Sequence, residues 1–232
     1  MKKLTQLSIL IIFALLSCDD GRIYDTEAIL PEEGRVVKLT GEVTGNNNWT
    51  DKYSVVLAGF DDESEYAIIT KSVPLTGKTE VVLSGIGDEV TRMELCVINR
   101  LRKRIVTLQA FECPATADTI RLEASPIDAG MYATIQDRLF STTCAACHGY
   151  GERAAAGLFL TEGRSHAALV GKESVKVPGM LLVAEGNAEE SVLYQTLASE
   201  VSTGWGYDHT KEVLSPTWLE LLKDWIDAGA KE

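Results

Sequence analysis

The pentapeptide Cys144-Ala145-Ala146-Cys147-His148 constrains the fold of this chain more than any other stretch. It places two thiols three positions apart and an imidazole directly after the second thiol, at the end of a segment with helical periodicity. This spacing is typical of covalent attachment of a c-type haem, in which each thiol forms a thioether bond and the imidazole binds the iron. We therefore expect a helix that ends at the two cysteines, next to a flat apolar group.

Two other chemistries use the Cys-x-x-Cys spacing. A structural zinc site needs four ligands, and no second cysteine pair or nearby Cys/His cluster completes such a set. A dithiol redox motif of the thioredoxin kind lies in a strand–turn–helix, and no such pattern precedes Cys144. Haem c is therefore the predicted cofactor, with Cys144 and Cys147 as thioether residues and His148 as the proximal iron ligand.

Residues 1–17 have the pattern of a signal peptide. Lys2 and Lys3 precede a mostly apolar run, residues 4–16, which is too short to cross about 30 Å of hydrocarbon comfortably. The run ends in Leu15-Leu16-Ser17-Cys18, which resembles the lipobox of bacterial lipoproteins. We expect lipidation of Cys18 and anchoring to the inner or outer membrane, on its periplasmic or cell-surface face. Lipoboxes usually have a smaller residue than leucine at the place of Leu16, so ordinary secretory cleavage is the alternative.

The charge balance limits the classes of partner. Removal of residues 1–17 leaves 20 basic against 34 acidic residues, a net charge of −14. This charge argues against nucleic-acid binding and against electrostatic adsorption to anionic lipid. It is compatible with a basic protein partner.

The chain changes its pattern twice after the signal peptide. Residues 18–34 are polar and aperiodic, which indicates a tether. Residues 35–124 contain about seven β-rich runs separated by turn residues, which predicts an antiparallel β-sandwich of the immunoglobulin or fibronectin III kind. The runs are 36–43, 53–60, 66–73, 79–83, 90–99, 104–111 and 119–123.

Helical periodicity begins after these runs. Ser125 and Pro126 have the pattern of a helix cap followed by proline at the first helical position, so we place a domain boundary between residues 124 and 127. Ser215 and Pro216 repeat this pattern before an apolar helix face, and Gly229 suits the end of that helix. Residues 125–232 are therefore predicted to form a small all-α domain.

Four motifs of this second half carry a family resemblance. They are Cys144-x-x-Cys147-His148-Gly149, Gly157-Leu158-Phe159-Leu160, Gly186-Asn187-Ala188-Glu189-Glu190-Ser191-Val192-Leu193-Tyr194 and Trp225-Ile226-Asp227-Ala228-Gly229-Ala230. The segment from about residue 130 onward resembles a monohaem class I cytochrome c domain, of the variety common in planctomycete proteins. The resemblance implies a small helical haem domain that carries electrons.

The second axial ligand of the iron departs from that family. The family usually has methionine just before the last helix, where this chain has Gly204-Trp205-Gly206-Tyr207-Asp208-His209. His209 is the favoured distal ligand, and Asp208 or a backbone carbonyl is expected to orient its ring. Met180, in a Pro-Gly-Met loop, is the alternative. Two imidazoles would give a lower haem potential than His/Met ligation.

Cys96 and Cys113 remain as a possible disulfide. If the strands around them form a hairpin that turns near Leu101, Cys96 faces position 106. Cys113 then lies about seven residues farther along, on the order of 23 Å at 3.3 Å per residue. A disulfide needs Cα atoms within about 7 Å, so only a looped connection would join this pair.

These features favour electron transfer between redox partner proteins. A six-coordinate haem leaves no iron site for substrate, so one-electron exchange is the expected chemistry, and we expect a carrier rather than an enzyme. The sandwich would then act as a spacer or docking module. A haem-based gas sensor, with the sandwich as binding module, is the alternative. A peroxidase with an open distal position is a third hypothesis, and no residue is assigned a catalytic role.

Overall fold

The computed structural model describes residues 34–75, 77–116, 118–149, 154–213 and 215–232. The predicted signal peptide, the predicted lipidation site Cys18 and residues 18–33 of the predicted tether lie outside these described residues. None of the helices within the described ranges combines the length and the apolar character needed to span a bilayer.

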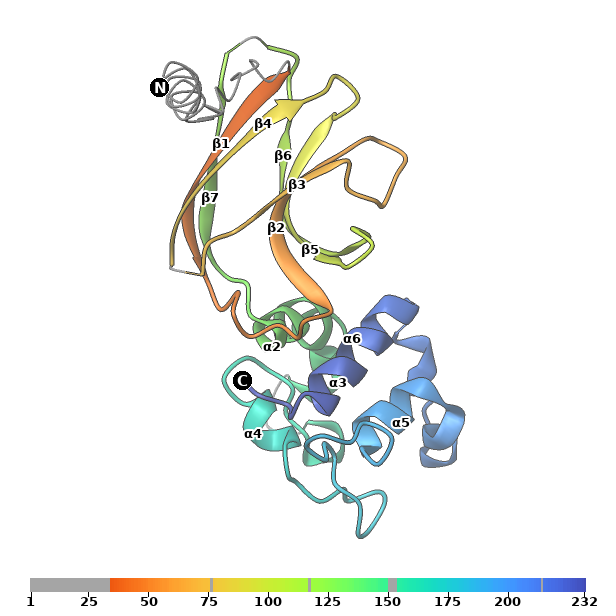
Figure 1. The fold of residues 1–232 in the computed structure, drawn as a ribbon. Coiled ribbons are helices and arrows are strands. Elements are labelled where there is room, and N and C mark those ends of the chain that lie inside the picture. Colours follow the sequence, from red (N-terminus) through yellow and green to blue (C-terminus); the bar gives the residue numbers. More distant parts are fainter. Residues whose placement is uncertain (1–33, 76, 117, 150–153, 214) are drawn as a thin grey trace, which may run out of the picture. The chain divides into compact units, whose positions relative to one another are not determined.

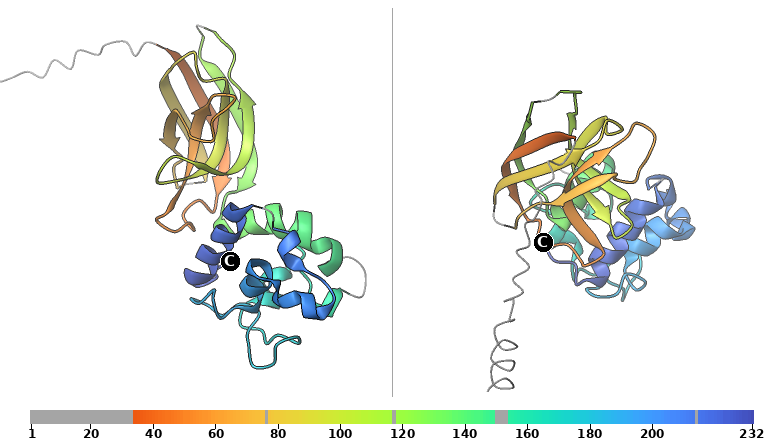
Figure 2. Two further views of the ribbon diagram at one scale, coloured as in Figure 1. Left: turned by 90° about the vertical axis from the view of Figure 1, so that its right-hand side faces the viewer. Right: turned by 45° about the horizontal axis from the view of Figure 1, so that its top comes forward.

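Within the described ranges, seven β-strands form two sheets that face each other (Figure 1, Figure 2). One sheet has the order β4-β1-β7 and the other has the order β3-β2-β5-β6. Neighbouring strands are antiparallel, except that β1 and β7 are parallel. The strands are β1 (Arg35–Thr44), β2 (Tyr53–Phe60), β3 (Ile69–Ser72), β4 (Lys78–Ile86), β5 (Arg92–Asn99), β6 (Arg104–Glu112) and β7 (Ile120–Asp128).

Alternation of side chains explains how the sheets pack. In β1, Val37 and Leu39 are fully buried between the sheets, whereas Lys38 and Thr40 between them are partly exposed. The central strand β5 is buried on both faces, because its outer residues Cys96 and Ile98 belong to a second, smaller apolar cluster. That cluster also contains residues of β2 and of the loop that follows it, namely Val56, Ala58, Phe60 and Ala67.

Five short α-helices follow the strands in the described part of the chain. They are α2 (Met131–Ile135), α3 (Ala145–His148), α4 (Ser165–Leu169), α5 (Val192–Ala198) and α6 (Pro216–Asp227). A π-helical segment, Gln136–Cys144, joins α2 to α3, and 3-10 turns occupy Ala155–Gly157, Glu200–Trp205 and His209–Lys211. Helix α6 has Ser215 at its N-cap position and Pro216 at its start, as the sequence pattern predicts.

The predicted fold class is wrong. The described chain is mostly β, with two sheets and five short α-helices, and a small all-α cytochrome c domain is not seen in it. Four of the helices have 4–7 residues, a length at which an isolated helix is not stable in water. Tertiary packing holds them instead. Apolar residues of both halves belong to one core within the compact unit Glu33–Glu232.

The predicted helix start at Ser125 and Pro126 is also wrong, because both residues lie in β7. The register between β1 and β7 shifts at this point: Gly41 pairs with Ala124, and Val43 pairs with Ile127. Such an irregularity accommodates proline, which has no N–H to donate to a neighbouring strand. The helix begins at Met131 instead.

Polar contacts also join the sheets to the helices. In α6, Asp224 accepts hydrogen bonds from Lys52 Nζ at 2.6 Å and from Tyr53 Oη at 2.7 Å, at the start of β2. Arg138 of the π-helical segment donates to the Leu108 carbonyl of β6 at 3.0 Å. The two halves therefore share polar contacts as well as apolar packing.

Candidate functional site

A continuous helical run, residues 131–148, presents the Cys-x-x-Cys-His residues. Cys144 ends the π-helical segment, and Cys147 and His148 lie in α3. Apolar side chains on the other side of the run are buried in the core, including Ile135, Leu139 and Phe140. Cys144 is partly buried and Cys147 is exposed, so the two thiols lie at the edge of the core. A π-helical segment next to a reactive motif is a common feature of functional sites.

The ring of His148 is held by the backbone. Its Nδ1 lies 3.0 Å from the Ala155 carbonyl oxygen, and because a carbonyl only accepts, Nδ1 carries the proton. Nε2 then keeps a free lone pair, which is the usual arrangement of a metal-binding histidine. Burial lowers the pKa of His148, and neighbouring His209 lowers it further, against the opposite effect of backbone hydrogen bonds. The imidazole is therefore neutral at pH 7.

Gly149 lets a later segment approach the end of this helix. The His148 carbonyl accepts a hydrogen bond from Leu160 N at 2.6 Å. A Cβ atom on residue 149 would lie 2.7 Å from Thr161 Cγ2 and 2.8 Å from the Ala145 carbonyl oxygen. Any side chain at this position would therefore push the 160–161 segment away from His148.

His209 faces His148 from a different part of the chain. It begins the 3-10 turn His209–Lys211, and its ring centroid lies 6.2 Å from that of His148, with the planes inclined by 34°. Two metal–nitrogen bonds of about 2 Å, plus the distance from each nitrogen to its ring centre, add up to about 6 Å. His209 Nδ1 is buried and has no hydrogen-bond partner among the described residues. The pair is therefore spaced as two axial ligands of one metal ion would be.

Met180, the alternative distal ligand, lies in another loop. Its backbone N–H donates to the Val177 carbonyl at 3.2 Å, and its carbonyl accepts from Ser174 N at 2.8 Å. The ring that faces His148 is that of His209, so the geometry favours His209. The third histidine, His166, has its Nε2 2.7 Å from the Ala230 carbonyl oxygen and packs against Tyr132 and Trp225.

The thiol environment does not suit a dithiol redox site. Burial raises the pKa of Cys144 to about 12, and the nearby carboxylate of Glu212 acts in the same direction. Redox-active Cys-x-x-Cys pairs instead have a lowered thiol pKa, often at a helix N-terminus. Here the pair lies at the C-terminal end of the 131–148 run.

The residues also lack the ligand set of a zinc site. Among the described residues, no three His, Cys, Asp or Glu side chains are placed to hold one metal ion. Two facing imidazoles suit a group that supplies its other metal donors itself, as a porphyrin does. The residues present therefore fit a haem better than a bare metal ion.

The possible disulfide is not formed in the structure, where Cys96 and Cys113 are both free. Cys96 pairs with Thr107 across the sheet, while the N–H of Cys113 bonds to the Thr91 carbonyl, five residues before Cys96. Five strand residues span on the order of 16 Å, beyond the reach of a disulfide. The two thiols also lie in different apolar clusters.

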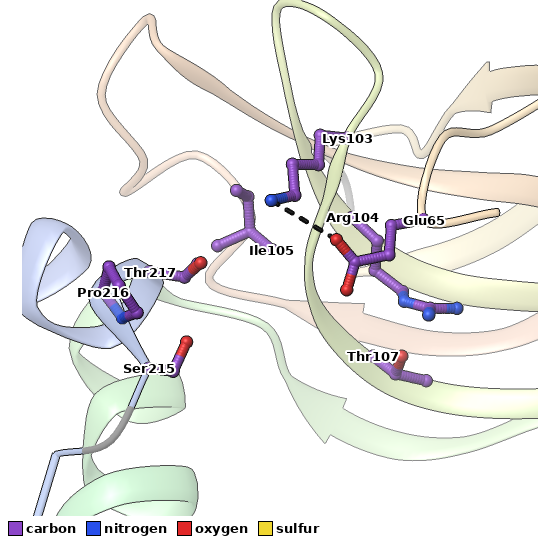
Figure 3. A pocket seen from close by; sticks show the side chains of 8 residues that line it. All are labelled: Glu65, Lys103, Arg104, Ile105, Thr107, Ser215, Pro216 and Thr217. Carbon is purple, nitrogen blue, oxygen red and sulfur yellow. Dashed lines mark ion pairs between the residues drawn. The ribbon is translucent and has the colours of Figure 1, made fainter.

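A surface pocket lies between the β5–β6 hairpin and the start of α6 (Figure 3). Its charged groups are already paired: Lys103 Nζ lies 3.3 Å from Glu65, and Arg104 Nη1 lies 2.8 Å from buried Glu94. Among the described residues that line this pocket, no nucleophilic side chain is paired with an adjacent base. Its lining residues are Glu65, Lys103, Arg104, Ile105, Thr107, Ser215, Pro216 and Thr217.

No family model and no curated protein matches this sequence. The functional argument therefore depends on the site. Sequence reasoning proposed the cysteine pair and both histidines as site residues, and it expected Asp208 or a carbonyl to orient the His209 ring. The Asp208 carboxylate binds Thr210 instead. The Ala155 carbonyl that orients His148 gave no sequence signal, because any residue has a carbonyl.

Proposed function

We propose that this protein binds one haem c covalently and transfers single electrons between redox partner proteins. The observation that carries the proposal is the 6.2 Å separation of the His148 and His209 rings beside the Cys144/Cys147 pair. The cysteines would form the thioether bonds, and the two imidazoles would bind the iron. Haem supplies one-electron chemistry at its iron when it is bound.

The two histidines explain why the proposed role is a carrier and not an enzyme. His148 keeps Nε2 unprotonated because the Ala155 carbonyl holds the proton on Nδ1. If haem is bound, His148 and His209 would both hold its iron. Substrate then has no metal position to occupy, and a low potential relative to His/Met ligation is expected.

The sequence features of the N-terminal segment complete the proposal. Lipid on Cys18 would anchor the protein to the inner or outer membrane of a bacterium, at its periplasmic or cell-surface face. The net charge of −14 after removal of residues 1–17 favours basic redox partners through electrostatic steering.

The proposal is tested by maturing the full chain in a host that attaches c-type haem. The pigment should stay with the polypeptide in acidified organic solvent, and both oxidised and reduced spectra should be low-spin. His209→Ala should lose the low-spin spectrum and bind carbon monoxide. His166→Gln is the matched control and should keep the wild-type spectrum. A colourless protein, or a His209→Ala spectrum identical to wild type, would refute the proposal.

A further inference from the structure

We infer that Asp208 is a positioning residue that holds His209 in place as the second axial ligand, an inference that rests on the function proposed above. Asp208 precedes the 3-10 turn that His209 begins. Its Oδ1 accepts hydrogen bonds from the Thr210 backbone N–H at 3.1 Å and from Thr210 Oγ1 at 2.6 Å. A carboxylate in this position fixes the first residue of the turn, as a cap does for a helix.

A second contact fixes the backbone of His209. Its N–H donates to Ser202 Oγ at 3.1 Å, and Ser202 is fully buried in the preceding 3-10 turn, Glu200–Trp205. The Asp208 and Ser202 contacts therefore act on the same short segment. Together they set the position from which the imidazole projects.

Packing of Tyr207 completes the arrangement. Its ring meets that of His209 edge to face, with centroids 5.0 Å apart and planes at 79°. The Tyr207 hydroxyl donates to Glu212 Oε1, so the tyrosine is itself held on the far side of the turn. Tyr207 is itself half exposed to solvent.

The two imidazoles are consequently held in different ways. The His148 ring donates a hydrogen bond to a carbonyl, whereas His209 Nδ1 has no partner within the part of the chain that the structure describes. His209 depends on its turn and on Tyr207. Because ring hydrogen bonds normally fix metal-binding histidines, His209 is the ligand that a loosened turn would release.

The test compares carbon monoxide binding to the reduced, haem-loaded full chain in three forms. Asp208→Ala removes both hydrogen bonds to Thr210, and loss of such a cap should raise the released population, and the binding rate, about fivefold. Asp208→Asn keeps an acceptor oxygen of the same shape and should bind at the wild-type rate. The loss of its exposed contact to Lys211, at 3.4 Å, should matter little.

Equal rates for Asp208→Ala and wild type would overturn the inference, as would an Asp208→Asn rate equal to that of Asp208→Ala. If Asp208→Ala does not mature, Ser202→Ala tests the same turn, with faster binding expected and an unchanged rate contradicting the inference. Failure of the proposed function would be recognised separately. In that case the wild-type protein itself would lack the low-spin spectrum.

Discussion

Asp224 joins helix α6 to the start of β2, and its replacement by alanine should destabilise the sheets and the helices together. The side chain is only 7% exposed and accepts hydrogen bonds from Lys52 and Tyr53. Alanine would leave the Tyr53 hydroxyl without an acceptor at a site closed to most solvent. The expected loss of unfolding free energy in Asp224→Ala can be estimated from these two hydrogen bonds.

The Tyr53 and Lys52 hydrogen bonds contribute unequally to the stability of the folded state. The Tyr53 bond has a charged acceptor and a length of 2.7 Å, and bonds of this kind stabilise by about 1.5–3 kcal/mol. The Lys52 side chain is 56% exposed, so its ion pair adds about 0–1 kcal/mol. Asp224→Ala should therefore lower the free energy of unfolding by about 2–4 kcal/mol, most of it through Tyr53.

Urea unfolding of the full chain, followed by circular dichroism and by tryptophan fluorescence, measures this change. Trp49 lies near the sheets and Trp225 lies in α6, so the fluorescence reports on both halves. Both signals should shift together and with an unchanged slope. Asp224→Asn is the control, because its amide oxygen still accepts from Tyr53 and should retain most of the stability.

A loss below about 0.5 kcal/mol would refute the reasoning, since that is the range of an ordinary surface substitution. Separate transitions for the two signals would refute it as well. The sheets and helices would then unfold independently, and the shared core would not couple them.

Three further outcomes are expected. In haem-free protein, iodoacetamide should modify exposed Cys147 before Cys144, because burial raises the pKa of Cys144 to about 12. Peptide mass spectrometry measures the two rates, and equal rates would contradict this expectation. Gly149→Ala should lower haem incorporation, measured as haem absorbance per polypeptide, because the new Cβ would lie only 2.7–2.8 Å from neighbouring atoms. Unchanged incorporation would contradict the close approach of Thr161 to residue 149. Burial raises the pKa of Tyr53 above its ordinary 10.0, so the folded state holds its proton more tightly. Stability should therefore fall as pH rises above about 10, and less so in Tyr53→Phe, as urea unfolding across that range would measure.

Strands were more predictable from the sequence than the overall architecture. The run 53–60 coincides with β2, because a short apolar run rich in β-branched and aromatic residues between turn residues defines it locally. Ser125 and Pro126 have an equally clear local pattern, yet pairing with β1 places them in a strand. The fold class failed for the same reason. Short helical patterns do not reveal that their apolar faces share a core with the sheets.

In the candidate site too, some features have a local sequence signal and others depend on the fold. The Cys-x-x-Cys-His motif is a local signal, and the place of His209 before the last helix suggested its role. The facing of the two rings depends on how residues 200–212 fold back over the end of α3, which no local pattern encodes. The contacts of Asp208 with Thr210 are likewise visible only in the folded turn.

The parallel pairing of β1 and β7 determines which end of the sheet each neighbouring segment connects to. Both strands run from the end where residue 35 enters the sheet toward the end where Thr44 and Ala129 are hydrogen-bonded, just before the helical run. A ten-residue strand spans on the order of 30 Å. Residue 34 and the helical run 131–148 therefore connect to opposite ends of this pair of strands.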